Sequence, residues 1–267
     1  MQVGYIQFAP EFGETARNLE ALERIAREHA KGADLLVLPE LAGTGYLFTS
    51  REETLRFAEP FPDGPTAQCF ARVARETGAV VVGGFAERDG DRAFNSAALV
   101  RPDGTGHIYR KAQLFKDEKS FFEPGDTPFE PVEAGGVKLG LMVCFDWYYP
   151  EVARLLALRG AHILCHPSNL VLPYCPESMK TRCLENRVFA VTCNRTGSDR
   201  RGDRELHFIG MSQITGPDGS IILRAPRDGV HVGIAEIDPS LAENKDITGN
   251  NVWTEDRRRD LFGGLTE

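Results

Sequence analysis

The sequence lacks the cysteine and histidine patterns of a metal site or a disulfide framework. None of its six cysteines forms a Cys-x-x-Cys pair, and no histidine stands at the spacing of a zinc ligand. A chain of 267 residues is long enough to bury a large core without cross-links. We therefore expect free thiols, most of them small buried apolar groups, in a reducing cytoplasm.

Excess positive charge and long apolar runs are also missing. The formal net charge is −8, from 31 basic and 39 acidic residues, and the longest basic run, Arg257–Arg259, lies between two aspartates. Nucleic-acid binding usually needs a clustered basic surface. No window approaches the roughly 20 apolar residues of a membrane span. The N-terminus has no basic stretch followed by an apolar one, as a secretion signal would. We expect a cytoplasmic protein with neither nucleic acid nor membrane as a partner.

What the sequence does contain is an alternation of strands and helices. An apolar strand at Gln2–Ala9 precedes a helical period at Glu14–Lys31. Asp34–Leu38 is a continuous apolar run, typical of a strand covered on both faces. The alternation starts again after Cys144. The pattern predicts an α/β protein.

Two Pro-Asp-Gly turns, at 102–104 and 217–219, each join a pair of short strands, one pair in each half of the chain. This repetition predicts two similar halves, each with a mixed β-sheet and helices on one side. Two such halves packed sheet to sheet give a four-layer αββα sandwich with the helices outside. Nothing resembles a linker, so we expect a single domain over 1–267. Its C-terminal tail, about 247–267, is expected to take part in subunit contacts.

Two loops stand out between these elements. The stretch 112–127 is long, polar and aromatic, and long ordered loops often line functional sites. The stretch Asp199–Arg204 is densely charged, and we expect it to be an exposed loop.

A single thiol stands at the corner between a strand and a helix. The apolar run Leu139–Val143 ends in Cys144, and Glu151–Arg159 reads as a helix soon afterwards. A side chain at such a corner is pushed out of the sheet edge, as in the nucleophile elbow of other hydrolases. A helix N-terminus nearby favours negative charge, so the pattern predicts a thiol that ionises easily.

A nucleophilic thiol needs a base and a group that holds an oxyanion. None of the six histidines ends a buried strand beside a recognisable partner, and His166 is the best of a weak set. Glu40 and Lys111 each follow a predicted strand, as Cys144 does, and open α/β sheets place their sites at strand C-termini. Lys111 would keep Glu40 ionised and lower the pKa of the thiol. Taken singly, Glu40 and Lys111 can equally be surface charges.

Three motifs occur together and in order: Leu38-Pro39-Glu40, Tyr109–Phe115 (YRKAQLF) and Gly140–Glu151 (GLMVCFDWYYPE). Glu118 follows Lys111 by seven residues. With them the sequence resembles the nitrilase superfamily of carbon–nitrogen hydrolases. The resemblance continues through the segments 166–169 (HPSN) and 182–187 (RCLENR), so it covers nearly the whole chain.

The resemblance implies an αββα sandwich that forms homodimers or higher homo-oligomers, paired near the helix Glu151–Arg159. It implies a catalytic triad of Glu40, Lys111 and Cys144, with Glu118 as a second glutamate close to Lys111. Cys144 would attack the substrate carbon and form a thioester, with Glu40 as general base. Lys111 and the backbone N–H of Phe145 would form the oxyanion hole. No metal or organic cofactor is needed for this chemistry.

Phe145-Asp146 stands where true nitrilases commonly have Trp-Glu, and this favours a small carboxamide as substrate. A nitrilase on the same triad, an N-carbamoyl amine or amino acid hydrolase, and a binding protein without turnover remain alternatives. The candidate substrate-binding residues have aromatic or amide side chains suited to a small aliphatic or arylalkyl group: Tyr46, Phe115, Trp147 and Asn169. Their alternative roles are packing or subunit contact for the aromatic residues, and a hydrogen bond within its own loop for Asn169.

Overall fold

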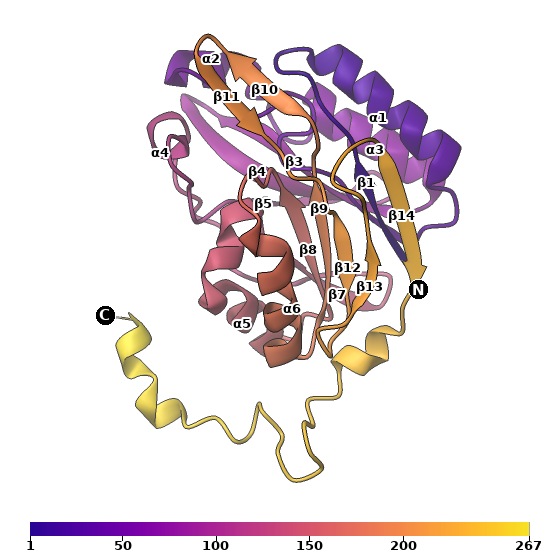
Figure 1. The fold of residues 1–267 in the computed structure, drawn as a ribbon, viewed down its shortest axis with the longest axis vertical. Helices are drawn as coiled ribbons and strands as arrows, with labels where there is room; N and C mark the ends of the chain where they lie inside the picture. The colour runs from indigo at the N-terminus through magenta and orange to yellow at the C-terminus, as the bar shows by residue number, and fades with distance from the viewer. Residues whose placement is uncertain (267) are drawn as a thin grey trace.

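Two six-stranded β-sheets form the centre of the protein, as a computed structural model that describes residues 1–266 shows (Figure 1). In spatial order the first sheet contains β14 (His231–Glu236), β1 (Gln2–Gln7), β2 (Leu35–Val37), β3 (Val80–Asp89), β4 (Arg92–Val100) and β5 (Gly106–Arg110). The second contains β13 (Ile221–Arg224), β12 (Gln213–Thr215), β9 (Phe189–Asn194), β8 (Ile163–Ser168), β7 (Val137–Leu141) and β6 (Val132–Ala134).

The two sheets repeat one topology, as the paired Pro-Asp-Gly turns predict. In the first sheet β1, β2 and β3 are parallel, and β4 and β5 return antiparallel. In the second sheet β7, β8 and β9 are parallel, and β12 and β13 return antiparallel. Each sheet also has an antiparallel strand on the far side of its first parallel strand, β14 and β6 respectively. The predicted mixed sheets are therefore confirmed.

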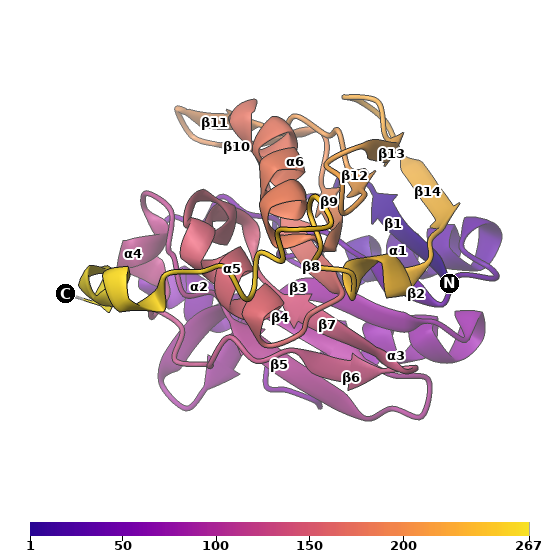
Figure 2. The ribbon, with the colours of Figure 1, turned by 90° about the horizontal axis from the view of Figure 1, so that it is seen from below.

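Helices cover the outer face of each sheet (Figures 1 and 2). Helices α1 (Thr15–His29) and α3 (Pro65–Thr77) pack on the first sheet, and α5 (Pro150–Leu158) and α6 (Tyr174–Asn186) pack on the second. Along β2 the side chains alternate: Leu35 and Val37 face the second sheet, whereas Leu36 faces the helices. Strands buried on both faces explain the continuous apolar runs in the sequence, and the αββα sandwich is confirmed.

Smaller elements lie at the edges of this sandwich. Helices α2 (Arg51–Phe57) and α4 (Glu118–Phe121) flank the strand ends, and α4 lies within the predicted long loop. Short 3₁₀ turns are η1 (Cys144–Tyr148), η2 (Pro239–Ala242), η3 (Arg259–Leu261) and η4 (Gly263–Thr266). The C-terminal arm, yellow in Figure 1, runs away from the sheets past α5. The last residue of the predicted tail, 267, lies outside the described residues.

The charged stretch predicted as an exposed loop is instead part of a two-stranded hairpin, β10 (Ser198–Arg201) and β11 (Arg204–His207). Asp199 is buried in it, 2% exposed, and pairs with the equally buried Arg195. The predicted exposure is confirmed for Arg200 and for residues 202–204 but was wrong for Asp199, because the sequence does not reveal that Asp199 has a buried cationic partner. The hairpin has no counterpart in the first half of the chain.

Candidate functional site

Glu40 and Lys111 are carried to the same edge of the first sheet. Glu40 follows β2 after Leu38 and Pro39, and Lys111 directly follows β5. The backbone of Glu40 passes so close to β3 that a Cβ on Gly84 would lie 2.4 Å from the Cα of Glu40. Glycine at 84 is therefore required for this approach, and it lets the Glu40 side chain turn inward to complete burial.

The two side chains join Glu118 in one buried hydrogen-bonded cluster. Lys111 Nζ donates to Glu40 Oε1 at 2.8 Å and to Glu118 Oε1 at 2.9 Å. Asn95 Nδ2 also donates to Glu40 Oε1, at 2.7 Å. The hydroxyl of Tyr46 donates to Glu118 Oε1 at 2.6 Å. Glu40 Oε2, by contrast, accepts no hydrogen bond from any described residue.

The charges in the cluster fix the protonation of its cation. Burial by itself would lower the pKa of Lys111, but the carboxylates of Glu118 and Glu40 outweigh it and hold that pKa well above its ordinary value. Burial raises the pKa of Glu118, and Lys111 opposes that rise. Lys111 is therefore an ammonium held between two carboxylates, with Glu118 Oε2 also 2.8 Å from its Nζ.

Cys144 lies at the sharp corner that the sequence predicts. Its φ of +40° is in the left-handed region that side-chain-bearing residues rarely adopt, and the 3₁₀ turn η1 begins there. Asp146 holds this corner: its carboxylate accepts from the N–H of Val143 at 2.9 Å, the hydroxyl of Tyr109 at 2.8 Å and the N–H of Gln113 at 3.0 Å. Asp146 thus ties the corner to the segment that carries Lys111.

The prediction of an easily ionised thiol was wrong. Burial and the negative charge of Glu40 raise the pKa of Cys144 well above its ordinary value, although Lys111 pulls it down. Helix α5 begins only at Pro150, after the intervening 3₁₀ turn, so its N-terminus does not adjoin the sulfur. The thiol of Cys144 is therefore neutral, and any reaction in which it serves as the nucleophile needs a base to take its proton.

His166 is not that base. It is fully buried, and burial lowers its pKa to about 4, so the ring is neutral at physiological pH. Its Nε2 donates to the carbonyl oxygen of Cys144 at 2.9 Å, and its Nδ1 lies 3.2 Å from the Thr192 hydroxyl. His166 therefore supports the backbone of the strained corner.

Cys144 opens into a small apolar cavity of about 140 Å³. Three of the four predicted substrate-binding residues line it: Phe115, Trp147 and Asn169. Further aromatic and aliphatic side chains complete the wall, namely Phe145, Tyr148, Leu170, Val171, Leu172 and Tyr174. The alternative of a hydrogen bond from the Asn169 side chain to its own loop is wrong, because neither side-chain atom bonds to a described residue.

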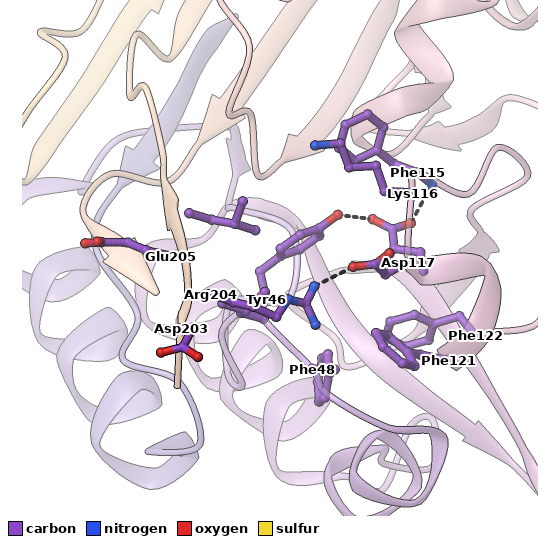
Figure 3. A pocket seen from close by; sticks show the side chains of 13 residues that line it. Tyr46, Phe48, Phe115, Lys116, Asp117, Phe121, Phe122, Asp203, Arg204 and Glu205 are labelled. Atoms are coloured by element: carbon purple, nitrogen blue, oxygen red, sulfur yellow. Dashed lines mark hydrogen bonds and ion pairs between the residues drawn. The ribbon is translucent and has the colours of Figure 1, made fainter. Parts of the chain in front are cut away.

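Tyr46, the fourth predicted residue, lies in a neighbouring cavity of about 370 Å³ (Figure 3). Phe115 lines both cavities, and Glu118 lines the second together with Tyr46. The β10–β11 hairpin forms part of the wall, and its Arg204 pairs with Asp117 across the space, as Figure 3 shows. Tyr46 is thus placed to orient Glu118.

Two functional contacts were not anticipated from the sequence. Asn95 bonds to Glu40, and its only signal was a polar residue inside the apolar strand β4. From the sequence, Asp146 indicated only a preference for an amide over a nitrile. In the structure its carboxylate holds the backbone turn at Cys144. No group of three or more acidic, cysteine or histidine side chains suited to a metal occurs within residues 1–266.

Comparison with known proteins gives a family match. Residues 2–245 match the carbon-nitrogen hydrolase family. The chain is 45% identical to a nitrilase of Pyrococcus abyssi over 98% of its length and 99% of that protein. It is 36% identical to an (R)-stereoselective amidase of a Pseudomonas species, covering 100% of this chain and 95% of the amidase. The crystal structure of a carbon-nitrogen hydrolase from Helicobacter pylori superposes with a TM-score of 0.88 at 26% identity, covering 100% of this chain and 98% of that one.

Proposed function

Because the chain belongs to the carbon–nitrogen hydrolase family, we propose that it cleaves a small carboxamide to a carboxylic acid and ammonia through a thioester on Cys144. The observation that carries this proposal is the buried cluster beside the thiol. It supplies an ammonium, Lys111, held between two carboxylates, and a carboxylate, Glu40, with one free oxygen. A neutral thiol needs both groups when it attacks: a base that takes its proton and a cation that holds the oxyanion.

In the first half of the reaction the sulfur of Cys144 attacks the amide carbon while Glu40 Oε2 takes the thiol proton. The amide oxygen becomes an oxyanion, held by the Lys111 ammonium and the backbone N–H of Phe145. The intermediate then collapses as Glu40 returns the proton to the departing nitrogen. Ammonia leaves, and the acyl group stays on sulfur as a thioester.

In the second half Glu40 removes a proton from water, which attacks the thioester carbon. The same two donors hold the second oxyanion, and the acid leaves as the proton returns to sulfur. Glu118 is a positioning residue in both halves, since it holds Lys111 and is itself held by Tyr46. The whole cycle uses side chains of this protein.

Nitrile hydrolysis on the same residues is the second candidate, because the Pyrococcus relative is named a nitrilase. The Phe145-Asp146 pair after the nucleophile favours the amide. A direct test is to compare isobutyramide with isobutyronitrile and to measure ammonia and acid. We expect the amide to react faster. Faster release from the nitrile would make the enzyme a nitrilase, and equal rates in Cys144→Ala and the wild type would refute both candidates.

An N-carbamoyl substrate is the third candidate. Among residues 1–266, none of those lining the cavity at Cys144 carries a charged side chain that could pair there with the second charge of a carbamoyl amino acid or of a carbamoyl diamine. Carbon dioxide release from N-carbamoyl compounds would support this candidate over the first. We further propose a reducing cellular compartment, since all six cysteines are buried free thiols.

A further inference from the structure

Asn169 is a buried amide without a partner. Its side chain is 3% exposed, and neither Oδ1 nor Nδ2 bonds to any group within residues 1–266. A buried polar group left unpaired lowers the stability of the folded protein. In an apolar wall, that cost indicates a side chain placed for a ligand.

The loop around Asn169 is held by other groups. Asn194 accepts from the N–H of Leu170 at 2.7 Å and donates to the carbonyl of Gly210 at 2.7 Å, so both ends of that amide are satisfied. The Asn169 side chain makes no such contact, and an apolar side chain of the same size would serve the loop equally well. Its presence is therefore not explained by folding.

Asn169 is also adjacent to the nucleophile. Its side chain lines the same cavity as the Cys144 thiol, and its backbone N–H lowers the pKa of that thiol. Asn169 shares this cavity with apolar side chains such as Leu170 and Val171. An acyl group on Cys144 that occupies the cavity would therefore lie beside the Asn169 amide.

We propose that Asn169 is a specificity residue that recognises a neutral hydrogen-bonding group on the acyl chain, close to the reacting carbonyl. The free amide offers one acceptor and two donors, so the matching group both donates and accepts: a hydroxyl or a second carboxamide. A charged substituent is disfavoured because no charged side chain lines this cavity. The inference rests on the proposed amidase function, since it names the class of that substrate.

The test is a matched pair of amides, 2-hydroxypropanamide and isobutyramide, which differ by a hydroxyl in place of a methyl group. The wild type should favour the hydroxy amide by about tenfold or more in kcat/KM, since isobutyramide leaves the buried amide unpaired. Asn169→Leu should remove or invert this ratio. Val171→Ala, which changes an apolar wall residue of the same cavity, should preserve it.

Binding to Cys144→Ala, measured by calorimetry, separates this inference from the proposed function. Tighter binding of the hydroxy amide supports the role of Asn169 even if neither amide is hydrolysed, in which case only the amidase proposal fails. Equal binding of both amides overturns the inference even if both are hydrolysed. A wild-type ratio near one, or equal losses for both amides in a folded Asn169→Leu, also overturns it.

Discussion

The two oxygens of Glu40 have different surroundings. Oε1 accepts from both Lys111 and Asn95, whereas Oε2 bonds to no described residue. The two donors fix the orientation of the carboxylate, so the free oxygen is held ready to accept a proton. A fixed base of this kind avoids reorganisation during the reaction.

Replacing Glu40 with glutamine tests this role. Glu40→Gln should lower kcat by about 10²–10⁴-fold, because an amide cannot take the thiol proton, while KM changes little. The matched control is Glu59→Gln, another buried glutamate, which bonds to Thr66 away from the site. Steady-state rates with the preferred amide measure both. A Glu40→Gln enzyme with more than a tenth of the wild-type kcat would remove Glu40 from the role of base.

Asp146 makes the stability of the folded protein depend on pH. Burial raises its pKa to about 6 from 3.8, so the folded state favours the protonated form. The contribution of Asp146 to the unfolding free energy is therefore fully present below pH 3.8, and it is lost as the pH rises through about 6. Relative to Asp146→Asn, the unfolding free energy of the wild type should fall by roughly 3 kcal/mol between pH 3 and 8.

Urea unfolding of both proteins across this pH range measures that difference. Other titrating groups cancel because they are common to the two proteins. A difference that stays constant with pH would show that Asp146 has the same pKa in the folded and unfolded states, so that burial does not raise it.

At the scale of elements, the β10–β11 hairpin is the main addition to the repeated halves. Its buried Asp199 accepts from Arg195 at 3.0 Å and from the N–H groups of Tyr46 and Leu47 at 2.8 and 3.1 Å. Arg201 of the hairpin also reaches Glu53 of α2 at 2.6 Å. The hairpin therefore fixes the loop that carries Tyr46, and through it Glu118.

Removing the Asp199 carboxylate should release this loop. Asp199→Ala leaves the Arg195 guanidinium buried without its carboxylate partner, so we expect a loss of about 3–5 kcal/mol in unfolding free energy. Asp203→Ala, at the exposed tip of the same hairpin, should change stability by less than about 0.5 kcal/mol. Denaturant unfolding compares the two. Equal, small effects would mean that Asp199 does not anchor the hairpin.

The sequence predicted those elements that short stretches of residues mark by their own pattern. The strand ends at Glu40, Lys111 and Cys144 follow from apolar runs and turns, and the shared motifs add the expectation that the three meet. The protonation state of the Cys144 thiol could not be predicted from the sequence. It depends on burial and on Glu40, which is 104 residues away in the chain. The burial of Asp199 and the lack of a partner for the Asn169 side chain could not be predicted either, since a sequence does not show which polar side chains are buried or left without partners.

At the scale of the whole molecule, large apolar side chains are exposed on one side of the second sheet. They belong to η1, α5 and α6 and to the loop before α6: Tyr148, Leu155, Leu158, Leu172, Tyr174 and Leu184. The C-terminal arm lies against the same side, with Trp253 under the guanidinium of Arg154 at 4.4 Å. Exposed apolar patches of this kind mark interaction sites. We propose that this face and the arm form a homodimer interface.

A charge placed on this face tests the interface. Leu184→Asp should shift the protein toward monomer, because a carboxylate would be buried without a partner. Leu241→Asp is the control, since Leu241 on η2 is 52% exposed against 53% for Leu184 but lies outside the face. Sedimentation velocity reports the oligomeric state. A wild-type monomer, or a dimer unchanged by Leu184→Asp, would rule out this interface.

The central claim is that Cys144 forms a thioester, and rapid acid quench followed by intact-protein mass spectrometry tests it most directly. During turnover of the preferred amide, the wild type should carry one acyl group. Peptide mapping should place that group on Cys144, and hydroxylamine should remove it. Cys144→Ala should carry none and release no ammonia. An acyl group on another residue, or ammonia release by Cys144→Ala at the wild-type rate, would contradict the account.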